Sequence, residues 1–204
     1  MLAFSSLLGN VEGQNIYRIW YDKPASYWEE ALPVGNGRIA AMVFGNPQLE
    51  QIQLNEETVS AGSPYQNYNE EAKTALPEMR RLIFEGKYEE AQNMAATKIL
   101  SQVGNEMPYQ TVGRLNIRYP DHKKVNNYYR DLDISNAVAV TRYEVDGVEF
   151  TEETFASFTD QLVIRHIKAS KPGTINCELF FNTPMRDPKR SIYGKKGLRL
   201  EGIT

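Results

Sequence analysis

The sequence predicts a mainly β protein: a large antiparallel β-sandwich, or super-sandwich, with a short two-helix insertion around residues 69–100. Short apolar or alternating segments are separated by turn residues over most of the chain, which is typical of strands. One interval alone has apolar residues at helical spacing. The whole chain has 204 residues, which is enough to bury roughly 70% of the unfolded surface, so we expect a substantial core.

Three strands are expected near the start of the chain, at Ile16–Tyr21, Arg38–Phe44 and Leu49–Leu54. Gly45-Asn46-Pro47 lies between the second and third segments and contains residues that favour turns. These two strands are therefore predicted to form a hairpin.

The interval from Asn69 to Leu100 predicts two helices, because its apolar residues recur every three or four positions. Pro77 is expected in the first turn of the first helix, where a missing N–H group costs nothing. Gly86 is expected just past the end of that helix. The result is a helical insertion in a strand-rich chain.

Strands are predicted again over the rest of the chain, and the hairpin at Asp146-Gly147 has the clearest signal. This dipeptide supplies the two positive φ angles of a type I′ turn. Val145 should then pair with Val148 on the buried face of the hairpin, and Glu144 should pair with Glu149 on the solvent-exposed face. The expected strands are Leu115–Tyr119, Tyr128–Ile134, Ala137–Val145, Val148–Phe155, Leu162–Ala169, Thr174–Phe181 and Leu198–Thr204.

Composition excludes several classes of function. The formal net charge is −3, which disfavours nucleic acid as a partner, and no apolar run is long enough to span a membrane. Cys177 is the only cysteine, so neither an intrachain disulfide nor a cysteine zinc site can form. His122 and His166 are the only histidines, and we expect no metal and no cofactor.

The chain is interpreted as one domain over residues 16–204, preceded by a terminus over residues 1–15 that is disordered or the remnant of a signal peptide. Met1–Gly9 is apolar but lacks a basic start. A frayed end explains it equally well. If it is a signal remnant, the protein is secreted or periplasmic.

Gly35–Ala40 spells a variant of the dinucleotide-binding fingerprint, with Glu56 about twenty residues further on. That fingerprint needs a buried strand before it and a helix after it. Pro33 and the short segment Arg38–Phe44 argue against both. A tight turn leading into a strand is the preferred interpretation.

Four residues are candidates for binding a sugar: Asn55, Glu56, Tyr65 and Tyr68. Carboxylate pairs carry out glycoside hydrolysis, but Glu56 and Glu57 are neighbours, and neighbours on a strand point opposite ways. A solvated loop in which the Asn55 side chain caps a turn is the alternative. The two tyrosines could stack on apolar sugar faces or pack in a core.

Other aromatic and nucleophilic residues have simpler interpretations. Trp20-Tyr21 and Tyr27-Trp28 are clustered aromatics, for which core or interface packing is the commoner outcome and sugar stacking the alternative. His166 is expected to be a hydrogen-bonded structural imidazole. Cys177 is expected to be a small packed residue.

Several long strings, in order along the chain, resemble the N-terminal domain of glycoside hydrolase family 95, whose best-known members are α-L-fucosidases. They cover nearly everything from Trp20 to about Pro184. The strings are WYDKPASYWEEALPVGNGRIAAMVFG (Trp20–Gly45), QLNEETVSAGSP (Gln53–Pro64), LPEMRRLIFEGKYEEAQ (Leu76–Gln92), MPYQTVGRLNIRYP (Met107–Pro120) and YYRDLDISNAVAVTRYEVDGVEFTEETFAS (Tyr128–Ser157).

The resemblance implies a β-sandwich that packs against a catalytic α/α barrel of the same enzyme, which acts on a fucosylated glycan. The barrel carries the acid and base, so no catalytic residue is expected in this chain and the chain alone should be inactive. A stand-alone carbohydrate-binding or interaction module is the alternative. Ser60 stands where members commonly have tryptophan, so substrate specificity is expected to differ if that aromatic lines the cleft or the barrel interface.

Overall fold

The structure is a computed structural model that describes residues 17–60, 66–101 and 109–203, and two compact units can be distinguished in it. Residues up to 58 together with 111–203 form the first unit, which contains every named strand. Residues 59–110 form the second, which contains both α-helices. The expected terminus at residues 1–15 lies outside the described residues, and a single domain over 16–204 stays a prediction.

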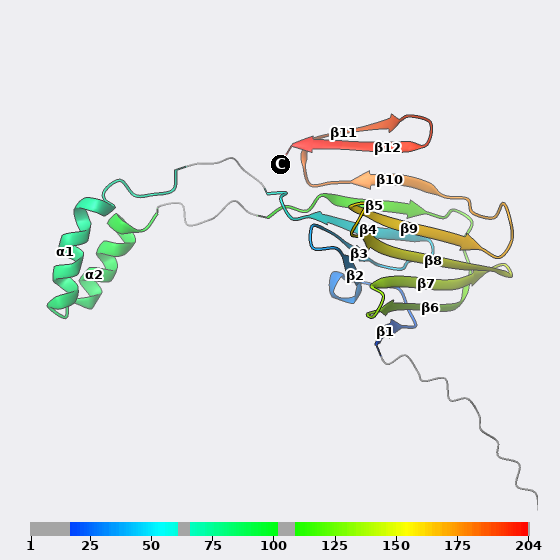
Figure 1. Ribbon diagram of the computed structural model, residues 1–204, viewed down its shortest axis with the longest axis horizontal. Helices are drawn as coiled ribbons and strands as arrows, with labels where there is room; N and C mark the ends of the chain where they lie inside the picture. The colour runs from blue at the N-terminus through cyan, green and yellow to red at the C-terminus, as the bar shows by residue number, and fades with distance from the viewer. Residues whose placement is uncertain (1–16, 61–65, 102–108, 204) are drawn as a thin grey trace, which may run out of the picture. The chain divides into compact units, whose positions relative to one another are not determined.

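The first sheet has five antiparallel strands in the order β1-β6-β7-β8-β9 (Figure 1). Four of them follow one another along the chain, so each pairs with its sequence neighbour. The strands are β1 (Arg18–Tyr21), β6 (Val125–Asp133), β7 (Val138–Val145), β8 (Val148–Ser157) and β9 (Leu162–Ala169).

The second sheet also has five antiparallel strands, in the order β10-β5-β4-β3-β2, and a separate hairpin is made by β11 and β12. The strands of the second sheet are β2 (Leu32–Gly35), β3 (Ile39–Val43), β4 (Leu49–Glu56), β5 (Gly113–Arg118) and β10 (Glu178–Asn182). The hairpin strands are β11 (Arg186–Tyr193) and β12 (Gly197–Ile203). The β3–β4 hairpin predicted around Gly45-Asn46-Pro47 is confirmed.

Side chains from both five-stranded sheets meet in one apolar core, which confirms the predicted sandwich. Burying each of the larger aliphatic side chains contributes about 1.5–3 kcal/mol to stability. The core members are Leu32, Val34, Ala41, Val43, Ile52, Ile117 and Tyr119 from the second sheet and the segment after it, and Leu132 and Ala139 from the first. A smaller cluster joins Tyr143, Val145, Val148 and Phe150.

The hairpin between β7 and β8 has the predicted turn. Asp146 and Gly147 have φ angles of 50° and 72°, as a type I′ turn requires. Val145 pairs with Val148 and both are buried, whereas Glu144 pairs with Glu149 on the other face. Alternation along these strands was therefore sufficient to predict which face is buried.

The helical insertion consists of α1 (Ala72–Phe84) and α2 (Tyr88–Met94), followed by a π-helical turn at Ala95–Ile99. Gly86 has a φ angle of 76° just past α1, which confirms its predicted place. The prediction for Pro77 is wrong, because this residue lies inside α1. The helix begins earlier, where the Oδ1 atom of Asn69 accepts the backbone N–H of Glu71 at 3.0 Å.

Two strands were not predicted, β2 and β11, and each contains a proline. Pro33 is tolerated because β2 is the edge strand of its sheet, where an N–H group need not be donated. The whole of β11 is exposed, so it has no alternation of apolar and polar residues to detect. None of the helices in the described ranges is long and apolar enough to cross a membrane.

Candidate functional site

Glu56, one of the predicted sugar-binding residues, caps the turn that follows β4. Its Oε2 atom accepts the backbone N–H of Thr58 at 2.9 Å and the Thr58 hydroxyl at 2.5 Å. Its Oε1 atom accepts the Nε–H group of Arg38 at 3.0 Å. These donors, led by the Thr58 hydroxyl, hold the pKa of Glu56 below its usual value. Both carboxylate oxygens are therefore already engaged.

Asn55 lies within β4 opposite Ala40, not in a solvated loop, and the predicted turn cap is supplied by Glu56 instead. Its Oδ1 atom is buried and accepts no hydrogen bond from the described part of the chain. Consecutive side chains on a strand point to opposite faces, so Asn55 and Glu56 do not converge on one ligand.

The two tyrosines of the predicted site are not assembled with Asn55 and Glu56 by any described contact. Tyr65 lies outside the described residues. Tyr68 is 66% exposed and belongs to the compact unit of residues 59–110. A sugar site that combines all four residues stays a prediction.

The glycine motif Gly35–Ala40 forms the hairpin between β2 and β3. The Oδ1 atom of Asn36 accepts the backbone N–H groups of Arg38 and Ile39 at 3.1 and 2.9 Å, and Gly37 has a φ angle of 92°. A strand follows the motif, where the dinucleotide fingerprint needs a helix. The preferred interpretation as a tight turn is confirmed.

Most of the clustered aromatic residues lie on the surface. Trp20, Tyr27 and Trp28 are more than half exposed, and Trp20 stacks on Tyr129 with 6.3 Å between ring centroids. Tyr21 differs, because the guanidinium of Arg130 lies 4.1 Å from the centroid of its ring. Core packing therefore does not account for the two tryptophans.

His166 and Cys177 have unremarkable surroundings. The Nδ1 atom of His166 lies 3.3 Å from a carboxylate oxygen of Glu153, so the imidazole is hydrogen-bonded as predicted, although it is half exposed. Cys177 is partly buried against the apolar core, as predicted. In the described ranges, no group of three or more His, Cys, Asp or Glu side chains is arranged to hold a metal ion.

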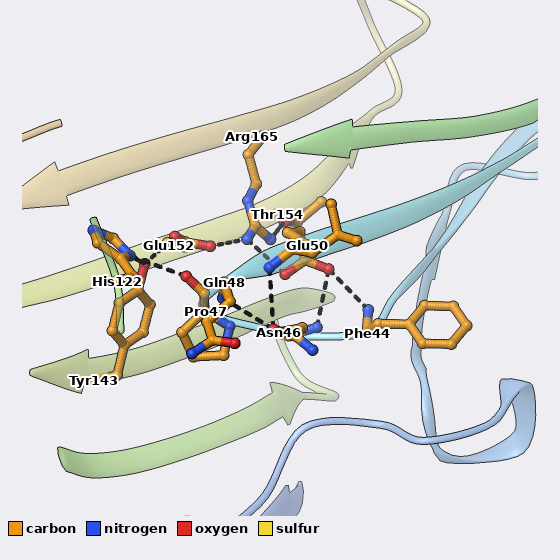
Figure 2. A network of polar contacts seen from close by, with 12 residues as sticks. Phe44, Asn46, Pro47, Gln48, Glu50, His122, Tyr143, Glu152, Thr154 and Arg165 are labelled. Atoms are coloured by element: carbon orange, nitrogen blue, oxygen red, sulfur yellow. Dashed lines mark hydrogen bonds and ion pairs between the residues drawn. The ribbon is translucent and has the colours of Figure 1, made fainter. Parts of the chain in front are cut away.

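A buried ionic network between the sheets was not predicted (Figure 2). Arg165 of β9 has a side chain that is only 8% exposed, and its Nη2 atom forms ion pairs with Glu50 of β4 and Glu152 of β8. Its Nη1 atom donates to the Thr154 hydroxyl at 2.7 Å. One cation thus links carboxylates from both sheets.

Glu50 also fixes the turn between β3 and β4. Its Oε1 atom accepts the backbone N–H groups of Phe44 and Gly45 at 3.1 and 3.0 Å. Burial raises the pKa of Glu50, and the nearby Arg165 opposes this shift. Burial alone would lower the pKa of Arg165, but the carboxylates of Glu50 and Glu152 raise it above its usual value.

An aromatic cluster completes the network. The Tyr143 hydroxyl donates to Glu152 at 2.7 Å, and burial followed by the charge of Glu152 raises the pKa of Tyr143. The Nδ1 atom of His122 lies 3.0 Å from the carbonyl oxygen of Pro47. Because a carbonyl can only accept, this nitrogen carries the proton. The His122 ring stacks on Tyr119 with 4.6 Å between centroids.

This network can hold the two sheets together, but it cannot flank a sugar. Glu50 and Glu152 are buried, and both are paired with the same guanidinium. A hydrolytic pair must instead lie on either side of a glycosidic bond in an open cleft. Alternation could have placed all three residues on inward faces. Glu50 and Glu152 each lie two positions from a buried apolar residue, Ile52 and Phe150, and Arg165 lies two positions from the partly buried Val163 and Ile167.

Glu56→Gln should change how stability depends on pH. A carboxyl group whose pKa is lowered by folding stabilises the folded state above its ordinary pKa, and loses this effect as pH falls through the lowered value. Urea unfolding at several pH values should therefore show a stability difference from the wild type near pH 7 that shrinks below about pH 4.5.

Glu57→Gln is the matched control, because the exposed Glu57 side chain makes no hydrogen bond or ion pair with the described residues. The stability difference between Glu57→Gln and the wild type should stay small at every pH measured. A Glu56→Gln difference that is constant from pH 7 to pH 3 would contradict the role of Glu56 as a charged cap.

Comparison with known proteins gives one family and three relatives. A family model described as "Glycosyl hydrolase family 65, N-terminal domain" matches residues 19–204. Alpha-L-fucosidase 2 of Arabidopsis thaliana is 37% identical over 181 residues, which are 86% of this chain and 21% of that protein.

Two fungal proteins are more distant relatives. Probable alpha-fucosidase A of Aspergillus niger is 26% identical over 162 residues, and its namesake in Aspergillus oryzae is 25% identical over 174 residues. The matches cover 74% and 80% of this chain, and 20% and 23% of those proteins. The chain thus spans about a fifth of the length of the relatives it matches.

Proposed function

Because the chain belongs to the family of glycosyl hydrolase family 65 N-terminal domains, we propose that it is the sandwich domain of an α-L-fucosidase that cleaves terminal α-L-fucosyl linkages. The observation that carries this proposal is the match to Alpha-L-fucosidase 2 at 37% identity over 86% of the chain. The proposal extends to membership of the whole enzyme in glycoside hydrolase family 95. The sequence strings from Trp20 to Ser157 support that finer assignment.

In this proposal the domain supports a catalytic barrel of the same enzyme and supplies no catalytic group. Two features of the described residues are consistent with this role. The buried carboxylates of Glu50 and Glu152 are bound to Arg165, and the Glu56 carboxylate caps a turn. We also propose that the enzyme is secreted or periplasmic, an assignment supported only by the apolar residues Met1–Gly9.

Hydrolysis of an aryl α-L-fucoside tests the proposal. The 204-residue chain should release no aryl alcohol above background, because rate acceleration requires positioned acid and base groups. An enzyme in which this domain is joined to its barrel should be active on the same substrate. Turnover by the 204-residue chain that is abolished by Glu56→Gln would overturn the scaffold role.

A second candidate function is sugar binding without hydrolysis, which is favoured by the exposed ring of Trp20 and the partly buried ring of Tyr129 on which it stacks. Flat aromatic faces on a surface can stack on the apolar face of a sugar ring. Titration with fucosylated glycans followed by tryptophan fluorescence tests it. No change in the tryptophan fluorescence at millimolar glycan would remove this candidate.

A further inference from the structure

A groove of about 720 Å³ lies on the outer face of the second sheet, where it crosses β4, β5 and β10. The pairing register defines two rows of side chains, each with one residue from each of the three strands. Gln51, Asn116 and Phe180 form one row, and Gln53, Arg114 and Asn182 form the next. We call these six residues the amide face.

The amide face carries more hydrogen-bonding capacity than an ordinary exposed strand surface. Four of its six side chains are primary amides, and each amide offers both donors and acceptors. Gln53 makes no side-chain hydrogen bond with the described residues, so its amide is available to a ligand. No carboxylate lies within ion-pair distance of Arg114 in the described part of the chain, and its guanidinium contacts only Gln51, at 3.4 Å.

Several contacts hold Asn116, Asn182 and Phe180 of the amide face in place before any ligand arrives. The Nδ2 atom of Asn116, a residue only 4% exposed, donates to the Oδ1 atom of Asn182 at 2.8 Å and to the carbonyl oxygen of Phe180 at 3.3 Å. The guanidinium of Arg118 lies 5.1 Å from the centre of the Phe180 ring. A preorganised surface loses less side-chain entropy on binding than a mobile one.

The groove shares a border with another hollow. A second hollow of about 470 Å³ is bordered by Lys23–Ser26, Phe44 and Asn46. Leu49 and Gln51 border both hollows, so the two are contiguous across β4. A ligand could therefore occupy positions on both sides of this strand.

From these observations we propose that the amide face binds an oligosaccharide of several sugar units, an inference that rests on the proposed function in a glycoside hydrolase. Sugar hydroxyls both donate and accept hydrogen bonds, and primary amides offer both kinds of partner. An apolar ligand would leave the amides unpaired at a cost. A nucleic acid would require several phosphate-binding cations, whereas the groove has two arginines in its lining, Arg114 and Arg118, and the second is paired with Glu178.

Nuclear magnetic resonance of the 204-residue chain tests the proposal, with 2′-fucosyllactose as the probe and lactose as the unfucosylated comparison. The side-chain amide signals of Gln51, Gln53 and Asn116 should shift with a dissociation constant of about 1 mM or below. Signal shifts with both sugars mean that the lactose unit, which the two probes share, is sufficient for binding. Signal shifts with 2′-fucosyllactose alone mean that the fucosyl unit is needed. Either result supports binding at this face.

Two substitutions separate binding from folding. Gln53→Ala should weaken binding about five-fold, since it removes hydrogen bonds only to the ligand. Gln161→Ala, in the turn before β9, is the matched control and should leave the affinity unchanged. Equal affinities of the two variants, or shifts confined to Trp20 and Tyr129, would overturn the proposal.

The binding experiment and the test of the proposed function measure different properties on different proteins. Hydrolysis is measured on an enzyme that includes a barrel, whereas binding is measured on this chain. An enzyme that cleaves aryl α-L-fucosides while this chain shows no shift at 10 mM probe would overturn the oligosaccharide site alone. Shifts at the amide face, with no fucosidase activity in the complete enzyme, would overturn the fucosidase assignment alone.

Discussion

Arg165→Met is expected to lower the free energy of unfolding by about 3–5 kcal/mol. The substitution leaves Glu50 and Glu152, both almost completely inaccessible, without their shared cation. An uncompensated carboxylate in a sandwich core must take up a proton or admit water, and either event destabilises the folded state. Urea unfolding followed by tryptophan fluorescence measures the loss.

Two further variants identify the cause. Arg199→Met removes an arginine from an exposed ion pair with Glu201 and should change stability by less than about 1 kcal/mol. The triple variant Glu50→Gln, Glu152→Gln, Arg165→Met should be more stable than Arg165→Met alone, because it leaves no unpaired carboxylate at positions 50 and 152. If Arg165→Met is as stable as Arg199→Met, the ionic network does not hold the sheets together.

Gly45→Ala is expected to destabilise the protein by about 2–5 kcal/mol. Gly45 has a φ angle of 73°, and a Cβ atom there would lie 2.8 Å from the Tyr128 hydroxyl and 2.9 Å from the Cδ atom of Arg130. The backbone of Gly45 is also held on both sides. Its N–H donates to Glu50, and its carbonyl oxygen accepts the Tyr128 hydroxyl at 2.6 Å.

Gly147→Ala is the matched control for this overlap. Gly147 has nearly the same φ angle, 72°, but nothing lies within 4 Å of an added Cβ atom. Gly147→Ala should lower the free energy of unfolding by about 1 kcal/mol, because alanine is less favourable than glycine at a positive φ angle. The same unfolding assay compares the two, and equal losses would show that the packing around Gly45 adapts to a methyl group.

The strands that follow a local rule were predictable, and the long-range contacts were not. Alternation and the Asp146-Gly147 turn were enough to predict the β7–β8 hairpin with its register. The same alternation marks Glu50 and Arg165 as inward-facing, but these residues are 115 positions apart. Nothing in a local pattern says which inward polar side chains will meet, so the network emerged only from the structure.

The same limit applies to the candidate binding residues. Asn55 and Glu56 are neighbours in sequence, yet a strand directs their side chains to opposite faces. The amide face was missed for the converse reason, because Gln53 and Asn182 are far apart in the chain and are joined only through β5. The pairing register of strands that are distant in the chain, which a single sequence does not reveal, determines which of these polar residues share a surface.

The order of strands along the chain has a consequence for folding kinetics. Strands β6 to β9 pair with their sequence neighbours, so this meander can form through small loop closures. Pairing of β4 with β5 must instead bring together segments separated by residues 57–112. Loop-closure entropy disfavours such a distant encounter early in folding. We therefore expect the meander to belong to the folding nucleus, and the second sheet to assemble on it after the rate-limiting barrier has been crossed.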